Sequence, residues 1–506
     1  IFSNKRNRNE PPIPIIKENS MEKKDLKPAG VFKYFEEICQ VPRPSKKEEK
    51  IIAYLKAFGA KHNLETKVDE AGNVLIKKPA TPGKENLQTV VLQSHIDMVC
   101  EKNNDVQHDF LTDPIETEID GEWLKAKGTT LGADNGIGVA TELAILADDS
   151  IEHGPLECLF TVDEETGLTG AFELKEGFMS GDILLNLDSE DEGEIFIGCA
   201  GGIDSVAEFA YKEVEVPAGY FFFKVEVKGL KGGHSGGDIH LGRGNANKIL
   251  NRFLSRMANR QDLYLCEING GNLRNAIPRE AYAICAVPED AKHDVRTELN
   301  IFTSEVENEL SVTEPDLKLV LESETPRKTA IDQDTTARLL KALYAAPHGV
   351  YAMSQDIPGL VETSTNLASV KMKPNHIIRI ETSQRSSILS ARNDMANTVR
   401  AVFQLAGANV TFGEGYPGWK PNPHSAILEV AAESYKRLFG VDAKVKAIHA
   451  GLECGLFLDK YPTLDMISFG PTLTGVHSPD ERMHIPSVEK FWKHLLDILA
   501  HVPAKK

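Results

Sequence analysis

Residues 90–97 read Val-Val-Leu-Gln-Ser-His-Ile-Asp, a short apolar run that ends in a histidine and an aspartate. A run of this length suits a buried strand, and its polar residues mark the point where the strand stops. Similar runs cover 156–162 and 183–187, whereas 47–63 and 135–147 have the character of helices. This alternation predicts an α/β sheet with helices on its faces.

The middle of the chain has a different pattern. Residues 221–227 alternate as in a strand, 245–258 have helical spacing, and 281–287 read as another strand. Helix and strand runs at 426–438 and 464–469 then return to the first pattern and would complete the first sheet. We therefore predict a first domain in two parts, 21–201 and 401–506, with a separate α+β domain inserted at 202–400. We find no internal repeat.

Histidine and acidic residues follow the apolar runs at five places. They are His95 with Asp97, Asp134, Glu164 with Glu165, Asp188, and His477. Ligands of α/β sheets bind at the carboxyl ends of the strands, so these residues predict one shared site. Two histidines with several carboxylates and no cysteine suit zinc, with manganese or cobalt as substitutes. The carboxylates outnumber the needs of one ion, which favours two ions sharing a bridging carboxylate.

Each of these residues has an ordinary interpretation when it is taken alone. A His-x-Asp string after a strand is usually a loop, and a Glu-Glu pair is usually a solvated turn. Asp134 before Asn-Gly suits a helix N-cap, and His477 before Ser-Pro suits a loop. The joint placement of these residues, and no single one of them, supports the metal site.

Longer strings resemble a known family. Ser-His95-Ile-Asp97-Met, Gly-Ala-Asp134-Asn-Gly-Ile-Gly, Asp-Glu164-Glu165-Thr-Gly, Asn-Leu-Asp188-Ser-Glu and Gly-Val-His477-Ser-Pro resemble the ordered motifs of the zinc aminoacylase/carboxypeptidase superfamily. A second set resembles the aminoacyl-histidine (Xaa-His, carnosinase-like) dipeptidases in particular, from about residue 25 to the end of the chain. That set is Gly-Gly-His234-Ser-Gly-Gly-Asp, Asn-Leu-Arg-Asn275-Ala-Ile-Pro, Gly-Leu-Val-Glu-Thr-Ser364, Arg385-Ser-Ser, Tyr-Pro-Gly-Trp419 and His449-Ala-Gly-Leu-Glu453-Cys-Gly.

The resemblance implies a zinc-peptidase-like catalytic domain with a mixed sheet, an inserted lid domain and two Zn²⁺ per subunit. Asp134 would bridge both ions, and the peptide bond after it is often cis in this superfamily. His95 and Asp188 would complete one ion site, and Glu165 and His477 the other. Asp97 would orient His95 through the second ring nitrogen, as carboxylates behind metal ligands commonly do.

The reaction that the resemblance implies is hydrolysis of dipeptides such as β-alanyl-histidine by a metal-bridged hydroxide. Glu164 would be the general base that later protonates the leaving amine. From the lid, His234 would stabilise the oxyanion and Arg385 would bind the substrate carboxylate. Asn275 would bind the peptide carbonyl or the carboxylate. We assign the substrate amine to Glu453 from its charge alone.

Several alternatives stay open. The substrate could be a general dipeptide, a tripeptide or an acylamino acid, because no residue here selects histidine. Gly233-His-Ser235-Gly-Gly237 fits the G-x-S-x-G string of serine hydrolases, but that motif needs an immediate helix. Inhibition by a chelator, and not by a serine-directed reagent, would distinguish the metallopeptidase from a serine hydrolase. A metal-stabilised binding protein is the non-enzymatic alternative, and the presence of Glu164 with the full ligand set argues against it.

Composition limits the partners and the compartment. The formal net charge of −18 argues against nucleic acid, and no apolar run is long enough to cross a bilayer. The seven cysteines are scattered and odd in number, which predicts reduced thiols and a cytoplasmic protein. The family fold often dimerises through its lid, which leaves a homodimer open. We expect residues 1–20, before Met21, to be a disordered leader or an artefact of the assumed start.

Overall fold

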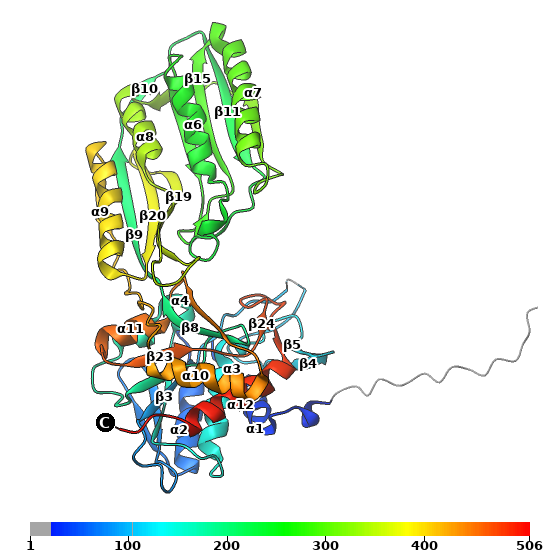
Figure 1. The fold of residues 1–506 in the computed structure, drawn as a ribbon. Helices are drawn as coiled ribbons and strands as arrows, with labels where there is room; N and C mark the ends of the chain where they lie inside the picture. The colour runs from blue at the N-terminus through cyan, green and yellow to red at the C-terminus, as the bar shows by residue number, and fades with distance from the viewer. Residues whose placement is uncertain (1–21, 104, 506) are drawn as a thin grey trace, which may run out of the picture.

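The computed structural model describes residues 22–103 and 105–505, and the predicted leader at 1–20 lies outside them. Figure 1 shows two lobes, each built around one large sheet. We call them the catalytic domain and the lid domain, as expected from the sequence. Within the described residues, no helix has both the length and the apolar character needed to span a membrane.

The sheet of the catalytic domain is mixed. Strand β3 pairs in parallel with β6 and β7, and β7 with β23, whereas β1, β2 and β6 pair antiparallel. Strands β3, β6 and β7 are buried along their whole length, which is why they read as continuous apolar runs. In sheet order the strands are β1 (Glu65–Val68), β2 (Val74–Lys78), β6 (Leu156–Thr161), β3 (Val90–His95), β7 (Ile183–Asn186), β23 (Asp465–Ser468), β8 (Glu194–Cys199) and β22 (Lys444–Ile448).

Helices cover both faces of this sheet. Val90 and Leu92 of β3 belong to one apolar core, and Val91 between them belongs to another on the opposite face. The first core includes α1 (Ala29–Cys39), α2 (Glu49–Lys61), α3 (Ala133–Ala147), α10 (Ala426–Phe439) and α12 (Ile485–Ala500), and the second includes α5 (Thr169–Glu173) and α11 (Glu453–Lys460). A small sheet beside them has the order β24 (Leu473–Thr474), β25 (Arg482–His484), β5 (Trp123–Ala126), β4 (Thr117–Asp120).

The lid domain is a nine-stranded antiparallel sheet that shares one apolar core with four helices. The main strand order is β16 (Lys318–Ser323), β11 (Tyr220–Lys228), β15 (Ala281–Pro288), β13 (Tyr264–Gly270), β19 (Val361–Lys373), β20 (Ile377–Ser386), β9 (Gly201–Ala210), β21 (Asn409–Phe412), with β18 (Gly349–Met353) beside β19. The helices are α6 (Ala246–Ala258), α7 (Lys292–Glu309), α8 (Gln333–Ala345) and α9 (Leu389–Leu405). Two-stranded ribbons pair β10 (Glu213–Glu215) with β17 (Thr329–Ile331), and β12 (Gly233–His234) with β14 (Ala276–Ile277).

The lid sheet is an internal duplication of topology. Strands β11, β13, β15 and β16, with α6 and α7, follow one another as strand–helix–strand–strand–helix–strand. Strands β9, β19, β20 and β21, with α8 and α9, repeat that order, and β13 meets β19 at the centre of the sheet. The first half is inserted in the connection between β9 and α8 of the second. The fold therefore contains a repeat that the sequence does not reveal.

The predicted fold class is confirmed, and each predicted element exists within a few residues of its expected bounds. The predicted helix at 245–258 is α6, where the Asn245 side chain caps the helix by accepting from Lys248 N. Strand β21 pairs with β9 of the lid sheet, although it lies beyond residue 400. We therefore propose that the lid extends to residue 412; the remaining domain bounds stay predictions.

Candidate active site

The predicted ligand residues lie around the carboxyl ends of neighbouring strands. His95 is the last residue of β3, Asp188 follows β7, and Asp134 lies in the first turn of α3. Glu164 and Glu165 begin α4 (Glu164–Gly167), a short helix that follows β6. Because β6, β3 and β7 are neighbours and parallel, their ends meet on one edge of the sheet.

Asp134 lies between the two histidines. Its Oδ1 is 3.1 Å from His95 Nε2, and its Oδ2 is 3.2 Å from His477 Nε2. His95 Nε2 also lies 3.5 Å from Asp188 Oδ1, and His477 Nε2 lies 3.0 Å from Glu165 Oε2. The cluster thus has two halves joined by one carboxylate, which is the grouping that the resemblance implied. The Asp134–Asn135 peptide bond is cis.

Asp97 lies behind the cluster and is fully buried. Its Oδ1 is 3.2 Å from His95 Nδ1, so it can fix which ring nitrogen of His95 faces the cluster. The backbone N–H groups of Glu164 and Glu165 also donate to the Asp97 carboxylate, at 3.1 and 3.2 Å. One side chain therefore orients both a histidine and the start of α4.

A second group of buried carboxylates, Glu48, Asp97 and Asp163, also lies close together. Each of the three carboxylates already accepts hydrogen bonds from donors of the chain. Glu48 Oε1 accepts from the backbone N–H of Lys46 and Asp163, at 2.9 and 3.0 Å. Ser45 Oγ donates to Asp97 at 2.7 Å. This group is a hydrogen-bonded support for α4 and His95.

The cluster around Asp134 fits a divalent metal. Ligand atoms of His95, Asp134 and Glu165, which come from both halves of the cluster, lie close together, and Glu165 Oε1 is buried without a hydrogen-bond partner. Burial raises the pKa of Asp188 to about 7 and raises that of Glu164 well above its usual value. Buried carboxylates of this kind need protons or cations to balance their charge. The residues present therefore suit metal binding, with nitrogen and oxygen ligands.

The same carboxylates raise the pKa values of the two histidines. Hydrogen bonds to Asp134 and Glu165 raise the pKa of His477 to about 11. Burial lowers the pKa of His95, but Asp188 and Asp134 outweigh burial and hold it well above its usual value. Both rings therefore lie in a strongly negative environment that would also attract metal cations.

Glu164 lines the open side of the cluster, together with a residue of the lid. Asp134, Glu165, Asp188 and His477 share with it a cavity of about 390 Å³, and His234 is part of the same wall. An adjoining cavity of about 590 Å³ is lined by Glu164, His234, Asn275, Arg385 and Tyr416. The structure thus brings residues of both domains to one site.

The contacts of His234 determine which of its ring nitrogens carries the proton. The backbone N–H groups of Gly236 and Gly237 donate to Nδ1, at 3.2 and 3.0 Å. Because Nδ1 accepts, the proton of the neutral ring is on Nε2. Burial, followed by the charge of Arg385, lowers the pKa of His234 to about 4. A neutral ring with a free Nε2–H is a hydrogen-bond donor for an oxygen that gains negative charge.

Arg385 is 7% exposed and comes from β20 of the lid. Its Nη1 donates to the hydroxyl of Tyr416 at 2.9 Å, and its Nε lies 3.3 Å from Ser235 Oγ. The sequence prediction missed Tyr416 as part of the site, although it begins the quoted Tyr-Pro-Gly-Trp419 string. Asn275 lines the same cavity as Arg385, which makes both available to a carboxylate or a carbonyl.

The surroundings of Glu453 and Ser235 do not match the roles that the sequence suggested for them. Glu453 is 1% exposed, accepts from Gln93 Nε2 at 2.7 Å and from Thr161 Oγ1 at 2.9 Å, and lies beneath the site. It therefore does not suit the direct contact with a substrate amine that we expected. Ser235 is also buried, and the two-residue strand before it leads into loop and 3₁₀ turn. That geometry is not the strand–turn–helix of a serine nucleophile.

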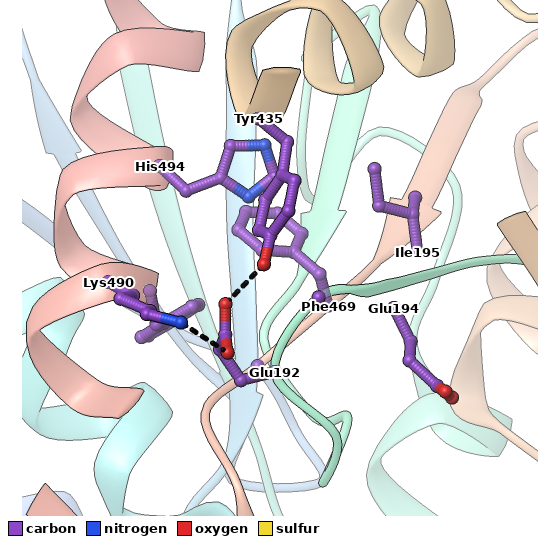
Figure 2. A pocket seen from close by; sticks show the side chains of 10 residues that line it. Glu192, Glu194, Ile195, Tyr435, Phe469, Lys490 and His494 are labelled. Carbon is purple, nitrogen blue, oxygen red and sulfur yellow. Dashed lines mark hydrogen bonds and ion pairs between the residues drawn. The ribbon is translucent and has the colours of Figure 1, made fainter. Parts of the chain in front are cut away.

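The segment after Asp188 is anchored at its far end by Glu192. Tyr435 of α10 donates to this carboxylate, and Lys490 Nζ of α12 lies 3.1 Å from it, as Figure 2 shows. The cavity between them has a volume of only about 10 Å³, which is room for roughly one water molecule. We therefore assign these residues a role in holding the segment and no ligand of their own.

Comparisons with known proteins identify the family of this chain. Residues 91–501 match the model of peptidase family M20/M25/M40. The chain is 47% identical to the cytosol non-specific dipeptidase of Escherichia coli, over 96% of this chain and 100% of that protein. The crystal structure of aminoacylhistidine dipeptidase from Vibrio alginolyticus matches with 46% identity and a TM-score of 0.89, covering 96% of this chain and 99% of that one.

A tripeptidase from Staphylococcus aureus, at 18% identity and a TM-score of 0.55, shares the fold over 94% of this chain and 99% of its own. The predicted resemblance is confirmed by the family match and by the two proteins of nearly half-identical sequence. The chain therefore belongs to peptidase family M20/M25/M40 and is a hydrolase of peptide bonds.

Proposed function

We propose that this chain is a cytosolic two-zinc dipeptidase that cleaves Xaa-His dipeptides such as β-alanyl-histidine. The observation that carries the proposal is the shared wall of the 390 Å³ cavity, where Glu164, the clustered carboxylates and His477 face the lid residue His234. A general base, candidate metal ligands and a hydrogen-bond donor are there within one small site. The names of the Escherichia coli and Vibrio relatives support a dipeptide substrate.

His95, Asp134 and Asp188 would hold one zinc ion, and Asp134, Glu165 and His477 the other. When bound, zinc would lower the pKa of water and polarise the scissile carbonyl. Glu164 takes a proton from the attacking water as its oxygen bonds to the carbonyl carbon, and delivers that proton to the amine as the C–N bond breaks. The Nε2–H of His234 donates to the oxygen that becomes negative.

Arg385 and Asn275 bind the far end of the substrate in this proposal. A guanidinium can bind a carboxylate through two parallel hydrogen bonds, and Tyr416 holds this one in place. The substrate is then fixed between its C-terminal carboxylate and the metal ligands. In a longer peptide, the second residue carries a peptide bond where a dipeptide has its free carboxylate. Binding of a carboxylate at this position therefore supports dipeptides over longer peptides.

A broader specificity is the second candidate. The relative from Escherichia coli is named a non-specific dipeptidase, and no described residue gives a reason to prefer histidine. An acylamino acid would lack the free amine, and Glu453 does not line either cavity where it could receive one. These candidates share the site and differ only in the side chains and end groups they accept.

The first test measures hydrolysis of β-alanyl-histidine by metal-free protein, with and without added zinc, for wild type and Glu164→Ala. Zinc-dependent cleavage by wild type, and its loss in a variant that still binds zinc, would support the proposal. Glu173→Ala, an exposed glutamate of α5, is the matched control and should keep full activity. The dipeptidase proposal would be refuted if zinc-loaded wild type hydrolysed none of β-alanyl-histidine, α-dipeptides and acylamino acids.

A further inference from the structure

The loop that presents Asp134 is held by a carboxylate from the far end of the chain. Glu481 Oε2 accepts from the backbone N–H of Leu131 and Gly132, at 2.8 and 3.0 Å. Its Oε1 accepts from Ala133 and Asp134, at 2.8 and 3.3 Å. Glu481 is 2% exposed, so these hydrogen bonds lie away from water. One side chain thus binds four successive N–H groups.

These N–H groups have no alternative partner in the helix. The first N–H groups of an α-helix lack acceptors within it, and Gly132, the residue before α3, has no side chain to cap it. A carboxylate at this position also interacts favourably with the helix dipole. Glu481 therefore supplies the N-terminal acceptor that the local sequence does not contain.

A buried cation holds the other side of the same loop. Arg43 is 3% exposed, and its Nη2 donates to the carbonyl of Gly132. Its Nη1 donates to the carbonyls of Ile96 and Asp97, at 3.1 and 2.9 Å. Gly132 has a φ of +68°, and a Cβ there would lie 2.6 Å from Arg43 Nη2. The loop is therefore fixed between an anion and a cation that reach it from different segments.

The two side chains connect three of the segments that carry proposed ligands. Arg43 joins the loop before Asp134 to the residues that directly follow His95. Glu481 joins it to the segment of His477, four residues earlier, where the Glu481 N–H donates to the Ser478 carbonyl at 3.0 Å. Neither side chain lines the cavity around the cluster. A shift of either would move ligands relative to one another.

We propose that Glu481 is a positioning residue for the metal cluster, which sets the place of Asp134 relative to His477 and His95. This inference rests on the proposed function, because it assumes that these three residues bind metal. It predicts that Glu481→Gln lowers the zinc affinity of the folded protein about 10- to 100-fold, the range typical of partners that hold metal ligands in place. The amide nitrogen of Gln cannot accept, so two of the four N–H groups would lose their acceptor.

A purely structural role would have the same effect on stability and no specific effect on metal. Glu314 provides the matched control, because it is also 2% exposed and accepts from two backbone N–H groups, Lys231 and Gly244, both at 2.8 Å. These residues belong to the lid and lie outside the metal cluster. Glu314→Gln should lower the melting temperature of the apoprotein without changing zinc affinity.

The experiment compares full-length wild type, Glu481→Gln and Glu314→Gln after metal removal. Zinc affinity is measured by competition with a chromophoric chelator, and the visible spectrum of added Co²⁺ reports the coordination geometry. Weaker zinc binding and an altered cobalt spectrum in Glu481→Gln alone would support the inference. Wild-type zinc binding and an unchanged spectrum in Glu481→Gln, or equal weakening in both variants, would overturn it.

Two further results separate the possible failures. If wild type binds no zinc or cobalt, the proposed function fails and the inference fails with it. If wild type and Glu481→Gln both bind two ions equally, only the positioning role fails. Should Glu481→Gln not fold, Glu481→Asp keeps the charge on a side chain one methylene shorter, which cannot reach all four N–H groups. It should show the same weakening to a smaller degree, and unchanged affinity would again overturn the inference.

Discussion

Ser364 Oγ of the lid lies 2.7 Å from Nε2 of His449 in the catalytic domain. His449 follows β22 and comes directly before residues 450–452, which line the cavity of the metal cluster. Ser364 pairs across the sheet with Arg385, the proposed carboxylate ligand. The backbone also approaches closely here, since a Cβ on Gly236 would lie 2.0 Å from the His449 carbonyl oxygen. This hydrogen bond therefore couples the position of Arg385 to the cavity wall.

We expect Ser364→Ala to raise KM for dipeptides more than it lowers kcat. Loss of the hydroxyl leaves a buried ring nitrogen without a partner, which costs about 1–3 kcal/mol. If this cost falls on the substrate-binding form of the lid, kcat/KM should fall by about 5- to 150-fold. Steady-state kinetics with the zinc content measured in parallel would check this. Ser369→Ala, a buried serine on the same strand, is the control. Equal effects of both substitutions would contradict the coupling.

For His234, we expect the Ala variant to lose about 10²- to 10³-fold in kcat with little change in KM, as for removal of one oxyanion donor. His234→Gln should recover part of this loss, since its amide can donate. The pKa of about 4 also predicts that protonation of His234 causes no step in the rate between pH 5 and 8. Substituting the exposed His240 should leave kcat unchanged. A large rise in KM for His234→Ala would point to ground-state binding instead.

Two of the five strings do not end an apolar strand, because Asp134 lies in the first turn of α3 and His477 follows the two-residue strand β24. The other three could be predicted, because each follows a buried apolar strand. Parallel pairing of β3 with β6 and β7 then brings them together, so local sequence was enough for His95, Asp188 and the Glu164–Glu165 pair. Glu481 and Arg43 had no such signal. Their partners are backbone groups of distant loops, and backbone partners leave no trace in side-chain patterns. The only sequence signal for a role of Glu481 at the site is its position four residues after His477.

Charge alone was misleading for Glu453. A lone glutamate near a predicted site suggested an amine receptor, but Glu453 is 1% exposed, and its Oε2 accepts from Gln93 and Thr161 within the protein. The duplication of the lid was invisible for a different reason. Its halves share strand order and not side chains, and the insertion of one half into the other removes any fixed period.

Arg385→Lys should weaken binding of dipeptides that have a free carboxylate. Lysine keeps the charge but lacks the planar fork that forms two hydrogen bonds, so we expect KM to rise about 10-fold or more, in line with the 1.5–3 kcal/mol of a charged hydrogen bond. A dipeptide with an amidated C-terminus has no carboxylate to lose and should be affected much less. Comparing KM for the two substrates, in both proteins, isolates this contact. An equal rise for both would contradict the assignment of Arg385.

The stability of the lid should depend on pH through His348. Asn245 Nδ2 and the Leu367 N–H lie 3.2 and 3.4 Å from its Nδ1, and a backbone N–H can only donate, so Nδ1 must be unprotonated. Burial, with the nearby charge of Lys248, lowers the pKa of His348 from 6.5 to about 4. Above pH 6.5 the ring is neutral in both the folded and the unfolded chain, and it contributes no pH dependence.

As the pH falls from 6.5 to about 4, the unfolded chain binds a proton at His348 that the folded protein does not. The free energy of unfolding should therefore fall through this window, by at most about 3 kcal/mol from this residue. His348→Gln should lose less stability than wild type over the same range, measured by denaturant unfolding at each pH. His293→Gln, an exposed histidine of α7, should follow wild type. Parallel pH curves for wild type and His348→Gln would show that folding does not lower the pKa of His348, and would contradict this prediction.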